Sequence, residues 1–176
     1  MVLSDLDIIY IFTILKHFEL ASTVKLNRNK TKVFGFGNWQ GRLDWPYADL
    51  KVETEKVSIL GIFYTPNIDQ AADLCWSNIL DSIKKRVAIL SQRNFTIFQR
   101  AVLINISILS KVWYTAHTYP LTMKYAKLIS KEFFQFLWQS NYNPIKREVL
   151  YQSKDDGGLG IFNVFLSHKE FLQQRF

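Results

Sequence analysis

Adjacent carboxylates are the groups best suited to hold the metal ions of a phosphoryl-transfer site, and one short stretch of this chain has part of that pattern. Tyr47-Ala48-Asp49-Leu50 is close to Tyr-x-Asp-Asp, in which carboxylates help to hold two cations about 3.5–4 Å apart. Here Leu50 stands where the second carboxylate would be. We therefore interpret the stretch as an ordinary strand or turn and expect no metal site there.

The other residue types that do chemistry are isolated. His17, His117 and His168 have no ligand spacing to Cys, Asp, Glu or one another, so we expect structural or exposed side chains. Cys75 is the single cysteine, which excludes an internal disulfide or a multi-cysteine zinc site and predicts a core thiol. Residues 155–160 are rich in glycine but lack the strand and helix that flank a phosphate-binding loop, and they predict a structural turn.

One polar stretch follows the first expected helix. It is KLNRNKTKV, residues 25–33, and it contains Asn27, Lys30 and Thr31 between two short segments of strand-like composition. None of these is an obvious nucleophile, base or metal ligand. Taken alone, the stretch is typical of an ordinary loop before a strand.

The net charge of +7 is concentrated in one part of the chain. Residues 80–150 contain eleven Lys and Arg but only three Asp and Glu, whereas residues 1–79 carry eight basic and nine acidic groups. A localised basic region is the usual electrostatic footprint of a protein that binds phosphate backbones. A helical surface that is basic and merely solvated is the alternative, and charge alone does not separate the two.

The composition and the apolar periodicity predict an α+β protein. Apolar side chains make up 48% of the chain and aromatic ones 15%, which excludes disorder. Apolar residues at spacings of three and four predict a helix over 5–21, capped by Ser4 or Asp5. β-branched and aromatic runs then predict strands at 23–26, 31–36, 48–53 and 57–64.

The chain is predicted to be helical after residue 67. We expect a helix over about 76–90, a second, buried on most sides, over 97–117, a third over 122–139 and a last one over 163–174. Short links favour antiparallel neighbours. Lys84, Lys85 and Arg86 are expected opposite the apolar stripe of the first of these helices. Lys124, Lys127 and Lys131 are expected to share one outward stripe of the third.

Neither a signal peptide nor a membrane span is expected, because the apolar run near the N-terminus is short and follows two Asp residues. With a single cysteine, an intracellular location, cytoplasmic or nuclear or both, is the expectation.

The ordered set of motifs resembles the C-terminal half of the reverse transcriptase of non-LTR (LINE-type) retrotransposons. The set begins with a helix, Lys-Leu-Asn-x-x-Lys-Thr, a strand and Ile-Leu-Gly-Ile. It continues with Leu-Ser-Lys-Val-Trp-Tyr, Phe-Gln-Phe-Leu-Trp, Ile-Lys-Arg-Glu-Val-Leu-Tyr and Gly-Gly-Leu-Gly-Ile. The resemblance covers essentially the whole chain. It implies the end of a palm over 1–66, a helical thumb over 67–142 and a post-thumb segment over 143–176. The palm end would be a small, incomplete layer of helix and antiparallel sheet.

The resemblance also implies roles for individual residues. Asn27, Lys30 and Thr31 match the segment after the palm helix, from which a lysine can approach the incoming triphosphate. Leu60, Gly61 and Ile62 match the hairpin that supports the primer end, where a glycine lets another backbone approach. The basic helices match a thumb that follows the template–primer backbone. Its candidate contacts are Lys84, Lys85, Arg86, Arg93, Arg100, Lys124, Lys127 and Lys131.

One departure from the family changes the expected function. The catalytic Asp residues of the family precede the palm helix, and this sequence starts almost at that helix. We therefore expect a fragment of an RNA-directed DNA polymerase without catalytic residues, a metal or a cofactor of its own, Mg²⁺ belonging only to the full-length enzyme. Its expected partners are RNA, DNA or their hybrid, and a further copy of itself through exposed sheet edges, but not a membrane. The alternative is a non-enzymatic helical interaction module or a retroelement remnant without function.

Overall fold

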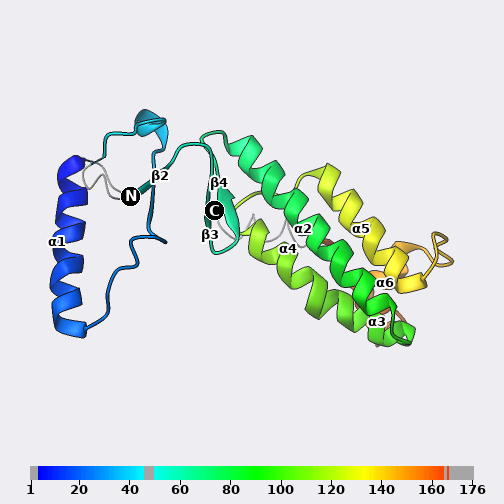
Figure 1. Ribbon diagram of the computed structural model, residues 1–176. Coiled ribbons are helices and arrows are strands. Elements are labelled where there is room, and N and C mark those ends of the chain that lie inside the picture. Colours follow the sequence, from blue (N-terminus) through cyan, green and yellow to red (C-terminus); the bar gives the residue numbers. More distant parts are fainter. Residues whose placement is uncertain (1–3, 46–49, 165, 167–176) are drawn as a thin grey trace. The chain divides into compact units, whose positions relative to one another are not determined.

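The computed structural model describes residues 4–45, 50–164 and 166. By contact, the chain forms two compact units, 1–71 and 72–176. Helices and two small sheets make this an α+β protein, as the sequence predicts (Figure 1). The expected domains 1–66, 67–142 and 143–176 stay a prediction.

The first helix, α1 (Asp5–Ser22), begins where the sequence predicts. Ser4 caps it in a capping box: its hydroxyl accepts from the Asp7 amide at 3.3 Å, and its own amide donates to the Asp7 carboxylate at 2.9 Å. The helix ends at Thr23, which has a left-handed backbone and donates its amide to the Glu19 carbonyl. This left-handed cap stands at the start of the segment 23–26, which is not a strand in the structure.

Two separate two-stranded sheets follow. β1 (Lys32–Phe34) and β2 (Lys51–Glu53) pair in parallel, with Val33 opposite Val52. A parallel pair needs a long crossover, and the chain between β1 and β2 contains a short 3₁₀ helix, η1 (Gly37–Trp39). The antiparallel layer expected from the sequence is therefore only half present. The second pair, β3 (Val57–Ile59) and β4 (Ile62–Tyr64), is an antiparallel hairpin where one strand was predicted.

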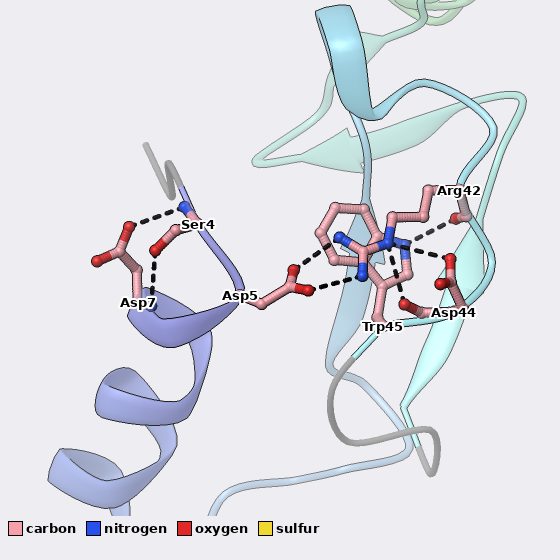
Figure 2. A network of polar contacts seen from close by, with 6 residues as sticks. All are labelled: Ser4, Asp5, Asp7, Arg42, Asp44 and Trp45. Atoms are coloured by element: carbon pink, nitrogen blue, oxygen red, sulfur yellow. Dashed lines mark hydrogen bonds and ion pairs between the residues drawn. The ribbon is translucent and has the colours of Figure 1, made fainter.

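A polar network ties the start of α1 to the crossover loop. The Arg42 guanidinium donates to both Asp5 carboxylate oxygens at 2.6 and 2.8 Å, and its Nε donates to Asp44 at 3.0 Å (Figure 2). It also lies 4.8 and 4.9 Å from the ring centres of Trp39 and Trp45. These hydrogen bonds lower the pKa of the Asp5 carboxyl below its ordinary value.

The second unit is a bundle of helices. It contains most of α2 (Ile68–Ser91), followed by α3 (Ile97–Leu103), a π-helical turn η2 (Ile104–Ile108), α4 (Leu109–Ala116), α5 (Met123–Trp138) and α6 (Arg147–Tyr151). Contacts at the two ends fix the directions. The Trp76 indole donates to the Pro120 carbonyl at 3.1 Å, and Arg100 donates to the Leu137 carbonyl at 3.0 Å. The α3–η2–α4 rod is therefore antiparallel to both α2 and α5, as short links favour.

The bundle has one continuous apolar core. Its largest fully buried side chains include Trp76, Ile83, Leu109, Phe133 and Phe136. The prediction of a helix over 97–117 that is buried on most sides is only partly right. Phe98, Val102 and Ile106 form a stripe at spacings of four and are 59%, 39% and 70% exposed, so one face of this helix is uncovered.

The segment after α5 closes the core. Leu150 of α6 is buried together with Ile161 and Val164. The Asn105 side chain, in the π-helical turn, donates to the Gly160 carbonyl at 2.8 Å and accepts from the Phe162 amide at 3.2 Å. This pair of bonds holds the segment 160–162 against the bundle. α6 was not predicted, and the helix expected over 163–174 lies mostly outside the described residues.

Candidate nucleic-acid interface

The two units differ completely in charge. Residues 1–71 contain eight Lys and Arg and eight Asp and Glu, whereas residues 72–176 contain fourteen and seven. The whole formal excess of +7 therefore belongs to the helical unit. A surface that follows a phosphate backbone needs such an excess on exposed side chains, so the position of each basic group decides what the unit can bind.

The clearest basic feature is a stripe on α5. Lys124, Lys127 and Lys131 are exposed, whereas Tyr125 and Ile129 on the opposite side are buried. With a rise of about 1.5 Å per residue, the three lysines cover roughly 10 Å of one helix face. Lys124 is partly engaged, since its ammonium lies 3.6 Å from the Asp73 carboxylate and 4.9 Å from the centre of the Tyr125 ring.

The Tyr125 hydroxyl, on the buried side of α5, stays neutral. The Tyr125 O–H donates to the Asp73 backbone carbonyl at 3.1 Å. Burial, with a smaller contribution from Asp73, raises the pKa of Tyr125 to about 12. Tyr125 therefore links α5 to α2 by a hydrogen bond, and it contributes no negative charge to the helical unit.

The basic residues of α2 are exposed but do not form a stripe. Lys84, Lys85 and Arg86 are consecutive, and consecutive helical residues point about 100° apart. The structure exposes all three, and Arg93, after the end of α2, is exposed as well. Among the residues that the structure describes, no acidic partner pairs with any of these four or with Lys127 and Lys131. Six cations are thus available to an external anion.

Arg100 has a different environment. It is half-buried, and its hydrogen bond to the Leu137 carbonyl places a cation at the last turn of α5, where the helix dipole favours positive charge. Lys111 and Arg147, which were not among the predicted contacts, are likewise engaged inside the unit: Lys111 donates to the Ser82 hydroxyl, and Arg147 lies 4.4 Å from the Phe134 ring centre.

The KLNRNKTKV stretch forms a tight turn in the first unit. The Asn27 carbonyl accepts from the amides of Lys30 and Thr31, each at 3.0 Å, and from the Thr31 hydroxyl at 2.9 Å. The Asn27 side chain accepts from the Lys30 amide at 3.2 Å. Asn27 and Thr31 therefore serve the turn itself, whereas the Lys30 side chain is exposed. Their expected role near a triphosphate stays a prediction.

The Leu60-Gly61 pair is the loop of the β3–β4 hairpin. Both residues have positive φ, 51° and 85°, which is the backbone of the two-residue turn that matches strand twist. A Cβ on Gly61 would meet nothing within 4 Å, so the turn needs this glycine for its φ and not for close approach. Leu60 is 85% exposed and Ile62 is buried. Their support of a primer end stays a prediction.

The remaining candidates behave structurally or lie outside the described part. Cys75 is buried, and His17 and His117 are exposed. Residues 153–160 form a turn in which the Gly158 amide donates to the Ser153 carbonyl at 2.8 Å. Tyr47, Asp49 and His168 are outside the described residues. Over the described ranges, no group of three or more His, Cys, Asp or Glu side chains is arranged to hold a metal ion.

In addition to the basic residues, the surface of the helical unit has one feature that the sequence did not lead us to expect. A hollow of about 350 Å³ on α3 is lined by Phe95, Phe98, Gln99, Val102 and Leu103. The spacing of four between Phe98, Val102 and Ile106 was the available signal, but it was assigned to the core.

No protein-family model matches this chain, and no curated protein matches its sequence. In the described part of the chain, no helix is both long enough and apolar enough to cross a bilayer.

Proposed function

We propose that the helical unit binds the phosphate backbone of nucleic acid without reading sequence, and that the chain is the palm-end, thumb and post-thumb portion of a non-LTR retrotransposon reverse transcriptase. The observation that carries this is the set of exposed cations without acidic partners in the described structure: the α5 pair Lys127 and Lys131, and Lys84, Lys85, Arg86 and Arg93. The ordered motifs of the sequence supply the family.

The chemistry of the surface supports backbone binding over base recognition. Long, flexible ammonium groups on exposed helix faces neutralise phosphates and release counterions, which gives affinity without sequence information. The preferred ligand in this proposal is an RNA–DNA hybrid. The chain alone is proposed not to extend a primer, and Mg²⁺ is proposed to act only in the full-length enzyme.

The test is a salt titration of binding. The full chain is titrated against a fluorescently labelled RNA–DNA hybrid by polarisation at several salt concentrations. The proposal expects affinity to fall steeply with salt. It expects the double variant Lys127→Ala and Lys131→Ala to bind more weakly and to reduce the slope of log K against log salt by roughly one to two.

A matched control distinguishes binding by this particular surface from a general effect of the net charge of the chain. Lys16→Ala with Lys56→Ala removes the same charge from exposed positions in residues 1–71. Equal weakening by both double variants would contradict the assignment to the helical unit. Salt-insensitive self-association without hybrid binding would instead favour the alternative, a non-enzymatic interaction module or a remnant without function.

A further inference from the structure

The first unit contains an apolar cavity that nucleic-acid binding does not use. It has a volume of about 590 Å³ and lies between α1 and the chain that follows it. From α1 it is lined by Ile8, Ile11, Phe12 and Leu15. Its opposite wall is made by all six consecutive residues from 31 to 36, which include β1.

The continuity of that second wall shows which part of β1 faces the cavity. Side chains of a strand alternate between its two faces, so a cavity over one face would contact every second residue. All three residues of β1, Lys32–Phe34, line the cavity, which points to the main chain of the strand and not to one of its faces. In the described part of the chain, β2 is the one strand hydrogen-bonded to β1, so the edge of β1 away from β2 has no strand partner there. An unpaired edge is a template for a further strand.

The charges around the cavity indicate the chemistry of a ligand that would fit it. Lys32 is the one charged residue among the lining residues, and it is paired with Glu53 at 3.0 Å. At the end next to Thr31, the exposed Lys30 gives positive charge. At the end formed by Ser4 and Trp45, Arg42 is already neutralised by Asp5 and Asp44 (Figure 2). The complementary occupant is apolar along its length and acidic at the end near Lys30.

We propose that this groove binds an extended apolar segment of another polypeptide, which joins β1 as an additional strand and lays alternate side chains against α1. β1 itself is three residues long, Lys32–Phe34, which is about 10 Å of strand at 3.3 Å per residue. The main-chain hydrogen bonds supply affinity and the apolar α1 face selects the side chains. An acidic residue of the segment lies beside Lys30. This inference does not depend on nucleic-acid binding.

The probe is a labelled seven-residue peptide of alternating valine and threonine with one terminal glutamate. It is made in two versions, with the glutamate at either end, because the strand direction is not specified. Binding to the full chain is measured by fluorescence polarisation. Peptides N-methylated at every second amide, in both registers, are the control for main-chain pairing. We expect one register to lose about tenfold or more in affinity. Equal affinity of both registers and the unmodified peptide would overturn strand addition.

A matched pair of variants tests the position of the groove. Ile9 and Ile11 lie on the same helix and are both 42% exposed, but only Ile11 lines the cavity. A buried carboxylate in an apolar groove is strongly disfavoured. Ile11→Glu is expected to weaken peptide binding by about tenfold or more, and Ile9→Glu by less than about twofold. Equal effects of the two variants would overturn the proposal.

A second copy of the chain is the competing occupant, and one further measurement distinguishes it. Sedimentation of the chain alone is combined with hydrogen exchange of the β1 amides that face away from β2. The proposal expects no concentration-dependent association through this edge, and it expects these amides to become protected only when peptide is added. Protection that rises with chain concentration in the absence of peptide would assign the groove to self-association and overturn the proposal.

Discussion

The helical unit and the first unit bury their apolar side chains to very different degrees. In the helical unit, Trp76, Ile83, Leu109 and Phe133 belong to one core cluster that also takes in Leu150 and Ile161. In the first unit, α1 buries Ile8, whereas Tyr10, Ile14 and Leu20 are 65%, 66% and 76% exposed. A helix with apolar side chains on nearly every side is typical of the interior of a larger assembly. The helical unit therefore buries most of its large apolar side chains in one core, with the face of Phe98, Val102 and Ile106 as an exception, whereas the first unit leaves most of the apolar side chains of α1 uncovered.

The largest expected difference is in local stability. Amides of α2 and α5 should exchange only through global unfolding, with a free energy of about 5 kcal/mol or more, whereas amides of α1 should open with a free energy near zero. Hydrogen exchange with residue-level resolution measures both. Equal protection of α1 and α5 would contradict the expected difference in stability between the two units.

Truncation of a core side chain should have the next largest effect, on the free energy of unfolding of the helical unit. Phe133→Ala removes a buried ring and is expected to lower the free energy of unfolding by about 3–5 kcal/mol. Phe98→Ala removes the same side chain from a position that is 59% exposed and should cost about 1 kcal/mol or less. Urea denaturation followed by circular dichroism compares the two, and similar losses would show that the cluster is not what stabilises the unit.

A smaller effect is expected at the bonds that hold the C-terminal segment. Asn105→Ala leaves the Gly160 carbonyl and the Phe162 amide without their side-chain partner, and we expect a loss of about 1–3 kcal/mol. Gln135→Ala removes an amide that bonds to Asn141 on the exposed surface and should change stability by about 0.5 kcal/mol or less. If thermal denaturation shows no difference between the two variants, the hydrogen bonds of Asn105 do not stabilise the bundle.

The smallest effect concerns pH and is confined to the first unit. The pKa of Asp5 is lowered in the folded state by the hydrogen bonds from Arg42, so the folded state favours the ionised carboxylate. The stabilisation is therefore present above the unfolded pKa of about 3.9, and it is lost as pH falls through the lower folded value. The fluorescence of Trp39 and Trp45 should report this acid transition, and Arg42→Gln should remove it. Asp44→Asn should leave it largely in place, because Arg42 would still hold Asp5.

Sequence reasoning succeeded where one physical signal dominated. The stripes of α2 and α5 follow from periodicity, and the structure confirms them. Of the two residues predicted to cap α1, Ser4 and Asp5, the structure shows Ser4 as the cap. The lysines of α5 are exposed for the same reason, since Tyr125 and Ile129 fix the opposite face.

The errors arise where distant parts of the chain decide the local structure. The composition of Leu60-Gly61 does not by itself predict a turn. One strand was therefore predicted where the structure has a hairpin. The parallel pairing of β1 and β2 depends on a long crossover, which no local pattern encodes. Arg100 appeared to be one more surface cation, because its partner, the Leu137 carbonyl, lies 37 positions away in the chain.

The π-helical turn at Ile104–Ile108 makes the number of residues in this rod as important as their identity. Such a turn holds one residue more than an α-helical turn, and it sets the angular phase at which α4 continues after α3. A substitution at the exposed Ile106 changes one side chain, whereas a deletion there would rotate everything C-terminal to it by about 100°. Val112 and Ala116 would then turn away from the core that they now complete. The rod therefore tolerates changes of composition at this point far better than changes of length.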